Sequence, residues 1–524
     1  MMRNELNRGL LLAFCLTVWW VGGCAQGPVV YRPKEQIRLD RALVECPAEF
    51  ELKQIVSNLN APTAIAIDAS DGTLLIAEGG IDGDEPRIYA LKPNFTLSLV
   101  YPYDRRIPFS PLQPGFQIYG PIGGMIAEHH RVYVSHRDVD GRGVITRFGY
   151  DGTHETIIGD LPAQGDFGVT DMVVGPNERL YFGVGSATNS GIVGLDNLRW
   201  FRKHREFCDQ AYQDLELLGL RFETKNPFAG LFGGSEIVNC GPYQPFGMSN
   251  RAHINKAANG NPTSAVYSVA LMGGDKQVEA FGIRFPRGLA FNENNVLYVT
   301  NDGMEMRGSR PVKDDPDSVL RIFYGGPPVD FGFPDYSADL QPITDKQFLP
   351  PIPLILPGGF ENLVSVVNRR ASGLREINEN VQSLVKAKFP PLSGAAKLAF
   401  VPGSGPFKRW RGDAIIALSG DRGPFATSGY ELKSPVGYKL VRVDVNSGKV
   451  EEFIHNTQSR PFSKTDRKGI ALERPIDVKI AANGVMYILD FGEVEYKPSG
   501  REKISNGTGK LFALVPIAAP ASQP

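Results

Sequence analysis

The chain has 524 residues, too many for one ordinary hydrophobic core, so its length predicts either several domains or a closed repeat architecture. With 58 glycines and 40 prolines it should contain many turns and short elements. Its formal net charge is −1 and its sequence has no basic stripe, which argues against a nucleic-acid partner.

Residues 1–23 have the composition of a bacterial export signal, with a basic start and a short apolar stretch at 9–21. The apolar stretch is too short to predict a membrane span. It ends in Val-Gly-Gly directly before Cys24, which resembles a bacterial lipobox, and Cys24 would then carry the lipid. Ordinary signal cleavage is the alternative. Because Ala25 follows the cysteine, we expect a periplasm-facing protein that is lipid-anchored in the outer membrane.

Removal of the signal would leave three cysteines besides the lipidated one: Cys46, Cys208 and Cys240. Outside the cytoplasm a disulfide is allowed. Cys208 and Cys240 lie in one long insertion, so we predict a bridge between them, which the loop-entropy model values at roughly 3.5 kcal/mol. Cys46 is left over, and no Cys/His cluster has the spacing of a zinc site.

After a predicted tether at residues 24–48, one pattern recurs six times: an apolar strand, a turn, and a second strand written Leu/Val-Tyr-Val or similar. Its copies occupy residues 63–78, 122–138, 169–185, 281–310, 396–418 and 475–492. Further strands follow most copies, so each unit is interpreted as roughly four antiparallel strands.

Six such units predict an all-β fold, a six-bladed β-propeller over residues 49–518. Stacking the sheets around an axis buries faces that a single sheet would expose. A strand at 50–56 is expected to complete the last blade and close the ring. The alternative is a set of unrelated hairpins in two sandwiches.

Two long insertions interrupt the repeats, at residues 189–263 and 337–394. The first contains a charged, helix-like stretch at 201–220, and the second a short helix near 377–387. Loops of this length are usually functional or partly mobile. Residues 519–524 are expected to be a disordered tail.

In a propeller, the residues before the first strand and after the second strand of each blade face one mouth of the central channel, which is the expected binding site. Polar residues gather at these positions: His136, Asp166, Asp171, Asn189, Arg284, Arg287, Asn301, Asp302, Arg307, Arg310, Lys397, Arg422 and Arg474. Arginines suit bidentate contacts with carboxylates, and carboxylate or amide oxygens suit Ca²⁺. The mouth could therefore hold a polyanionic cofactor and a cation. The alternative is that these groups pair as salt bridges between blades.

Three residues are candidate proton acceptors: Asp166, Asp171 and His136. The candidate cofactor-binding residues are Arg284, Arg287, Arg307, Arg310 and Arg474, and the candidate metal ligands are Asn189, Asn301 and Asp302. A lone histidine after a strand is more often a hydrogen-bonded surface group.

Three separated motifs resemble the glucose/sorbosone dehydrogenase family, and they occur in the family's order. They are VVGPNERLYFGVGSATNSG, GIRFPRGLAF followed by LYVTNDGMEMRGSRP, and ERPIDVKIAANGVMYILDFG. The resemblance covers roughly residues 50–516. It implies a six-bladed propeller that oxidises a sugar or alcohol by hydride transfer to pyrroloquinoline quinone (PQQ), with Ca²⁺ polarising the quinone. It also implies that Arg284 contacts PQQ and that Arg474 matches an arginine of the last blade.

The chain departs from the family pattern at the reactive positions. The family asparagine after Arg284 is Phe285, the residue after the next proline is Arg287, and the catalytic histidine position is Phe167. A phenyl ring cannot accept a proton, so either another residue substitutes or the scaffold has lost this reaction. The alternative functions are a Ca²⁺-dependent lactonase-type hydrolase and a non-catalytic propeller that binds protein or glycan through its insertions.

Overall fold

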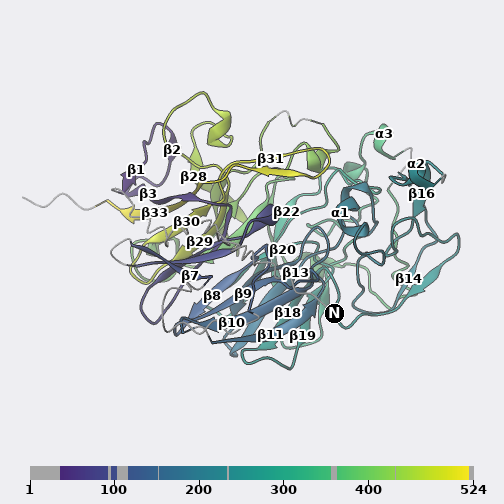
Figure 1. The fold of residues 1–524 in the computed structure, drawn as a ribbon, viewed down its shortest axis with the longest axis horizontal. Coiled ribbons are helices and arrows are strands. Elements are labelled where there is room, and N and C mark those ends of the chain that lie inside the picture. Colours follow the sequence, from purple (N-terminus) through teal and green to yellow (C-terminus); the bar gives the residue numbers. More distant parts are fainter. Residues whose placement is uncertain are drawn as a thin grey trace, which may run out of the picture.

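The computed structural model describes residues 36–92, 96–102, 116–151, 153–232, 235–355, 363–430, 432 and 434–517. The signal segment, Cys24 and the C-terminal tail lie outside these residues. Within them, antiparallel sheets form a ring of six blades, so the predicted β-propeller is confirmed (Figure 1). No helix among these residues has the length and apolar character of a membrane span.

The blades follow the order of the chain, and the first three begin with copies one to three of the repeat. Blade one contains β4 (Pro62–Ile67), β5 (Leu74–Glu78), β6 (Arg87–Leu91) and β7 (Leu97–Tyr101). Blade two contains β8 (Met125–Glu128), β9 (Arg131–Arg137), β10 (Gly143–Gly149) and β11 (His154–Leu161). Blade three contains β12 (Val169–Val174), β13 (Arg179–Val184), β18 (Ala265–Ala270), β19 (Gln277–Phe281) and the short parallel strand β23 (Val329–Asp330).

The last three blades begin with the remaining copies. Blade four contains β20 (Pro286–Phe291), β21 (Leu297–Asn301), β22 (Asp317–Ile322) and β24 (Val385–Phe389). Blade five contains β25 (Ala395–Phe400), β26 (Ala414–Leu418), β27 (Lys439–Asp444), β28 (Lys449–Asn456) and the short β2 (Val44–Glu45). Blade six contains β29 (Pro475–Ile480), β30 (Met486–Asp490), β33 (Gly509–Pro516), β3 (Phe50–Leu59) and the short β1 (Ile37–Arg38).

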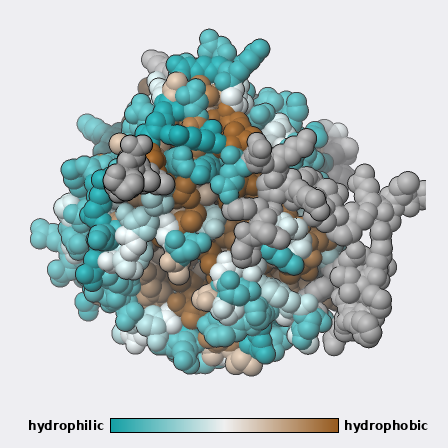
Figure 2. Space-filling model, turned by 90° about the vertical axis from the view of Figure 1, so that its left-hand side faces the viewer, coloured by the Kyte–Doolittle hydropathy of each residue, from teal (hydrophilic) through white to brown (hydrophobic). Residues whose placement is uncertain are grey.

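The two ends of the chain meet in blade six. β3 pairs antiparallel with β33, so the N-terminal strand completes the last blade and closes the ring, as the sequence predicts. β1 and β2 show that residues 37–38 and 44–45 of the expected tether pair with the propeller. Figure 2 shows the face that lies at the left of Figure 1, with hydrophilic residues along its left and upper edges and hydrophobic residues toward its middle.

The first insertion forms a separate lobe of short elements beside the ring (Figure 1). These are α1 (Leu198–Phe201), β14 (Leu215–Leu217), β15 (Phe222–Lys225), α2 (Ala229–Phe232), β16 (Ile237–Cys240) and β17 (Ile254–Lys256). The expected helix at 201–220 is wrong, because α1 ends where it should begin. The buried Asp209 carboxylate accepts bonds from the Ala187 N–H and the Thr188 hydroxyl, which tie this stretch to the loop after β13.

The second insertion packs against the first through a shared hydrophobic cluster that includes Leu217 and Val367. It contains α3 (Ile352–Ile355) and α4 (Glu379–Gln382), the latter within the range where a short helix is expected. The predicted insertion at 337–394 extends too far, because residues 385–389 form β24, the outer strand of blade four.

The predicted disulfide is wrong, because Cys208 and Cys240 are both free thiols. They belong to two different hydrophobic clusters of the first insertion. Cys240 lies on β16 opposite Phe222, whereas the Cys208 sulfur is 3.5 Å from the Lys256 ammonium. Shared membership of one insertion therefore does not bring the two thiols together.

Neighbouring inner strands approach closely because small residues and hydroxyls line their contacts. A side chain at Gly288 would place its Cβ 2.6 Å from the Ala396 carbonyl oxygen of the next blade, so this position requires glycine. The Thr300 hydroxyl donates to that same carbonyl at 2.7 Å, and the Ser135 hydroxyl donates to the Thr170 carbonyl at 2.8 Å. These bonds join blade four to five and blade two to three.

An ion cluster occupies the axis where the inner strands converge. The Lys397 ammonium lies 3.6 Å from the Asp171 carboxylate and 3.4 Å from the Asp477 carboxylate, and it donates to the Thr63 carbonyl at 3.0 Å. All three charged side chains are buried. The cluster links blades one, three, five and six.

We expect Lys397→Met to lower the free energy of unfolding by about 3–5 kcal/mol, because it removes the buried counter-charge of Asp171 and leaves Asp477 paired with Lys479 alone, at 3.2 Å. Urea denaturation followed by tryptophan fluorescence measures this loss. The matched control is Lys449→Met, which removes an exposed ion pair with Glu451 and should cost no more than about 1 kcal/mol. Equal losses in the two variants would contradict a structural role for the cluster.

Candidate functional site

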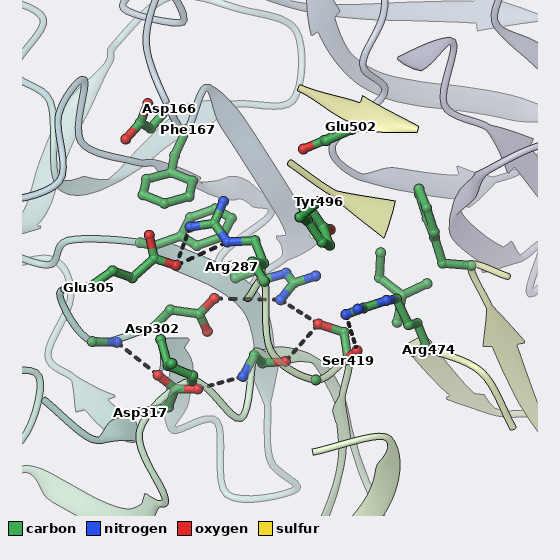
Figure 3. Close-up of a pocket in the computed structure, with 18 of the residues that line it drawn as sticks. Asp166, Phe167, Arg287, Asp302, Glu305, Asp317, Ser419, Arg474, Tyr496 and Glu502 are labelled. Atoms are coloured by element: carbon green, nitrogen blue, oxygen red, sulfur yellow. Dashed lines mark hydrogen bonds and ion pairs between the residues drawn. The ribbon is translucent and has the colours of Figure 1, made fainter. Parts of the chain in front are cut away.

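A cavity of about 220 Å³ lies at one mouth of the central channel, as the propeller topology predicts. Most of its lining comes from loops that precede first strands or follow second strands, and the first residues of β4, β20, β22 and β29 complete it. The lining residues are Thr63, Ile81, Asp166, Phe167, Phe285, Arg287, Asp302, Gly303, Glu305, Asp317, Leu392, Gly394, Ser419, Gly420, Arg422, Arg474, Ile476, Phe491, Tyr496 and Glu502. Figure 3 shows that labelled residues from blades three to six surround one space.

A flat aromatic wall forms at the two positions where the chain departs from the dehydrogenase pattern. Phe167 and Phe285 stack with ring centroids 3.8 Å apart and planes 17° apart. Gly185 makes room for this stack, since a Cβ there would lie 2.3 Å from the Cβ of Phe167. The guanidinium groups of Arg284 and Arg422 lie 4.8 and 5.3 Å from the Phe167 ring centroid, so cations pack against the wall.

Arg284, the predicted PQQ contact, is buried and does not line the cavity. All three of its nitrogens donate to the surrounding loops: Nε to the Asn189 carbonyl, Nη1 to the Asp302 and Gly303 carbonyls, and Nη2 to the Asn189 and Glu305 side chains. Five N–H groups thus have five acceptors, and none is left for a ligand. Arg284 therefore stabilises the loop after β21 by hydrogen bonds to its carbonyl groups.

Arg307 and Arg310 have structural roles too. Arg307 forms ion pairs of 2.5 Å with Asp166, Asp196 and Glu305. Arg310 pairs with Asp335 at 3.1 Å and donates to three backbone carbonyls of the two insertions and the segment between them. Neither arginine lines the cavity. Both arginines therefore agree with the alternative interpretation, in which the charged groups form salt bridges that link parts of the fold.

The three predicted proton acceptors do not form a catalytic group. Asp166 lines the cavity, but its two oxygens bind Arg307 and the Asn197 amide. Asp171 belongs to the axial ion cluster. His136 lies within blade two, where its ring nitrogens contact the Thr146 hydroxyl at 2.8 Å and a backbone carbonyl at 2.6 Å. Burial lowers the pKa of His136, which favours its neutral form there.

The three predicted metal ligands are not assembled into a site either. The Asn189 side-chain oxygen accepts bonds from Arg284 and the Glu305 N–H, and the Asn301 oxygen accepts the Phe285 N–H. Asp302 lines the cavity, and its Oδ1 is a buried atom without a hydrogen-bond partner among the described residues. A calcium ion would need several free oxygens converging at one point, and these residues do not provide them.

Another Asp/His cluster with metal-ligand spacing occurs in the described residues, away from the cavity. Asp68, Asp71 and His130 come from the β4–β5 and β8–β9 turns, at the other ends of the strands. The Asp68 carboxylate accepts the backbone N–H of His130 at 2.8 Å. These contacts join the turns of blades one and two.

Three arginines face the cavity instead. Arg287 donates through Nη1 to the Ser419 hydroxyl at 2.9 Å and lies 3.5 Å from Asp302, and its Nε and Nη2 have no hydrogen-bond partner among the residues described. Arg474 donates to the Ser419 and Asp421 carbonyls. Arg422 binds Glu305 through Nε and Nη2. Arg287 and Arg422 therefore each keep three N–H groups without a partner among the described residues, and in Arg287 these include all of Nη2 and Nε.

Glu305 holds this arrangement in its ionised form. Burial opposes ionisation of its carboxyl, but the guanidinium groups of Arg422, Arg307 and Arg284 outweigh burial and keep the pKa of Glu305 well below its usual range. The Glu305 carboxylate thus links the buried Arg284 and Arg307 to Arg422 in the cavity wall.

Four further residues at the mouth carry no signal in the repeat pattern: Glu305, Ser419, Asp317 and Tyr496. Tyr496 lies on a hairpin of β31 (Val494–Tyr496) and β32 (Glu502–Ile504), and its ring is 5.2 Å from the Arg474 guanidinium. Alternating residues around a Pro-Ser-Gly turn, VEYKPSGREKI, would have predicted this hairpin. Its position after the second strand of blade six places it at the same mouth.

We expect Arg284→Lys to lower the free energy of unfolding by about 2–4 kcal/mol, because an ammonium cannot reproduce the planar fork that satisfies five acceptors. Urea denaturation measures the change. Arg131→Lys, at an exposed position of β9, is the matched control and should change stability by less than about 0.5 kcal/mol. A stable Arg284→Lys protein with weakened ligand binding would instead restore Arg284 as a direct contact.

Comparison with known proteins supports the fold. No protein-family model matches this sequence, and no curated protein matches it. Among solved structures, an AA12 carbohydrate-active enzyme from Trichoderma reesei is 12% identical with a TM-score of 0.50, over 93% of this chain and 100% of that chain. The holo PQQ domain of pyranose dehydrogenase from Coprinopsis cinerea is 12% identical (TM-score 0.48, 91% and 98% covered). The apo soluble aldose sugar dehydrogenase from Escherichia coli is 13% identical (TM-score 0.45, 90% and 100% covered). At these identities, what the chain shares with the Trichoderma enzyme is the propeller fold.

Proposed function

We propose that this protein is an oxidoreductase that holds PQQ, or a similar planar anionic quinone, in the axial cavity and oxidises a sugar or alcohol there. One observation carries the proposal. Arg287 presents two guanidinium nitrogens without a described partner to a cavity whose wall is the Phe167–Phe285 stack. The resemblance of three sequence motifs to the glucose/sorbosone dehydrogenases supports it.

The charges and shape of the cavity suit such a cofactor. Carboxylate groups on a planar ring system would meet Arg287, Arg422 and Arg474, which approach from different loops. The stacked phenyl rings offer a flat apolar surface against which a conjugated ring can pack. When bound, the quinone would supply the two-electron acceptor that amino-acid side chains lack.

The cavity is small for a cofactor, so a side chain in its wall would have to move when the cofactor binds. Its volume of about 220 Å³ is below the ~300–1,000 Å³ usual for ligand pockets. The Arg287 side chain is one-fifth exposed and is held by a hydroxyl and one long ion pair, so it can swing outward as a ligand enters. No calcium ligand set is assembled here, and the proposal assigns no step to a metal.

The residues of the chain have distinct tasks in this proposal. Arg287 would bind a cofactor carboxylate. Arg474 would be kept in position by its hydrogen bonds to the Ser419 and Asp421 carbonyls. The β31–β32 hairpin would limit the access of water to the cavity. The same proposal includes anchoring through Cys24 at the periplasmic side of the outer membrane, on the basis of the export signal.

We expect the purified protein to bind PQQ, and Arg287→Ala to weaken that binding by about 10–100-fold, because it removes one or two charged hydrogen bonds. Quenching of intrinsic fluorescence on PQQ titration measures the Kd. Arg411→Ala, which removes an exposed pair with Glu293, is the matched control and should leave the Kd unchanged.

Dye reduction by the PQQ-loaded protein with a panel of aldoses and alcohols would identify the substrate class. If the wild-type protein does not bind PQQ at a PQQ concentration of about 100 μM, the proposed function is wrong. Lactone hydrolysis without PQQ would point to the hydrolase alternative.

A further inference from the structure

Arg137 is a partly buried arginine that has no carboxylate partner among the described residues. It is the last residue of β9, the second strand of blade two, so it lies at the same end of the blades as the cavity. Its Nε donates to the Ala163 carbonyl at 3.0 Å, in the loop that leads to Phe167 in the cavity wall. The adjacent Asp138 carboxylate instead accepts two backbone N–H groups of its own turn. The four N–H groups on the terminal nitrogens of Arg137 therefore have no acceptor in the described part of the chain.

A second unpaired arginine lies nearby. Arg199 belongs to α1 of the first insertion, is exposed, and has no hydrogen bond or ion pair with a described residue. The guanidinium carbons of Arg137 and Arg199 lie 4.9 and 5.3 Å from the ring centroid of Trp200, so the two cations share one indole ring. Asn197, two residues before Arg199, donates to the Asp166 carboxylate at 2.9 Å, which links α1 to the cavity wall. The arginine pair thus lies at the rim of the mouth.

The positive charge of this pair is not compensated by the described residues. Burial, followed by the positive charge of Arg199, lowers the pKa of Arg137 to about 10, and no carboxylate acts to raise it again. With that pKa, Arg137 is still a cation at neutral pH, so a partly buried charge has a neighbour of the same sign. This arrangement is unfavourable unless an anion joins it.

The chain contains a second Arg–Trp–Arg arrangement, which shows how such a pair is completed. The guanidinium carbons of Arg409 and Arg442 lie 3.8 and 5.9 Å from the ring centroid of Trp410. There, each arginine forms ion pairs with carboxylates of the protein: Glu49 for Arg409, and Asp413 and Glu451 for Arg442. At Trp200 the same geometry occurs without the carboxylates.

The terminal nitrogens of Arg137 are open to a ligand. Fully buried side-chain nitrogens without a partner occur in the described residues, including Trp200 Nε1, Arg310 Nε and Arg321 Nε, and the terminal nitrogens of Arg137 are not among them. These nitrogens therefore retain contact with solvent, as the exposed Arg199 side chain does. Trp200 Nε1 is closed off from solvent, so we assign it no contact with a ligand.

We propose that Arg137 and Arg199 form a binding site for an oxyanion, the carboxylate or phosphate group of a small ligand, at the rim of the mouth. Guanidinium groups bind such groups through paired, charged hydrogen bonds. A bound oxyanion would supply the counter-charge that Arg409 and Arg442 receive from the protein itself. The site is separate from Arg287, and the inference does not depend on the binding of PQQ.

The first test is calorimetric titration with inorganic phosphate, in an Arg287→Ala background that removes the unused nitrogens of the cavity. We expect binding with a Kd on the order of 1 mM, the affinity that a few charged hydrogen bonds provide. Arg137→Gln and Arg199→Gln should each weaken binding by at least about 10-fold. The matched control is Arg131→Gln, at the exposed other end of β9, which should leave the Kd unchanged.

Two results would overturn the inference: no binding at about 20 mM phosphate, or an unchanged Kd in either arginine variant. Because Arg199 is exposed, Arg199→Gln should fold normally even if Arg137→Gln does not. Loss of phosphate binding would leave the proposed function untouched, and failure of PQQ to bind would leave this inference untouched.

The second test identifies the source of the oxyanion. Glucuronate carries a carboxylate on a sugar ring, and glucose is its neutral counterpart. Binding of glucuronate at least about 10-fold tighter than phosphate would assign the site to sugar acids, whereas equal or weaker binding would assign it to free oxyanions. Glucose binding as tight as glucuronate binding, and equally weakened by Arg199→Gln, would show that charge is not recognised and would contradict the inference.

The third test supplies the counter-charge from within the chain. Arg199→Glu places a carboxylate near Arg137, as Glu49 is placed near Arg409. We expect this variant to lose phosphate binding and to unfold at a higher temperature than Arg199→Gln in a thermal melt. A lower unfolding temperature than that of Arg199→Gln would mean that Arg137 already has its counter-charge, and the inference would be wrong.

Discussion

The buried ammonium of Lys397 between Asp171 and Asp477 is the constraint on which the geometry of this propeller depends. Each carboxylate also fixes a neighbouring strand, since Asp477 accepts the Ile65 N–H at 2.9 Å and Asp171 accepts the Leu289 N–H at 3.3 Å. One charge cluster thus sets the spacing of the inner strands of five blades. Charges on the axis cannot be solvated by bulk water, so each must keep its partner, and the ring has one favourable closure.

Buried ion pairs also occur at the mouth of the channel. Two kinds of arginine are found there, which differ in how many of their nitrogens have acceptors. Arg284, Arg307 and Arg310 follow or precede the strands of blade four, are buried, and have acceptors for their guanidinium groups from loops of other blades and insertions. Arg287, three residues after Arg284, instead faces the cavity with nitrogens unused. These buried arginines link the loops around the mouth, and the loops in turn hold Arg287 and Asp302 in the cavity wall.

The sequence was sufficient to predict the ring, because a strand–turn–strand pattern repeated six times has few other ways to bury its faces. It also predicted which loops meet, since topology alone brings Arg287, Arg422 and Arg474 to one mouth. It could not separate Arg284 from Arg287, because the difference lies in how many carbonyls of distant loops surround each guanidinium. The failed disulfide and the failed helix at 201–220 have a similar cause: both depend on long-range contacts, such as those of Asp209, that local patterns do not contain.

The aromatic stack and the charged groups of the mouth are physically connected. Phe167 and Phe285 cannot accept a proton, and they place a flat apolar surface beside the guanidinium group of Arg287. Asp302 lies 3.5 Å from Arg287, and that guanidinium group lowers the pKa of Asp302 against the effect of burial. A carboxylate bound to the free nitrogens of Arg287 would offset part of this positive charge and raise the pKa of Asp302. Binding of an anion in the cavity and protonation of Asp302 are therefore coupled.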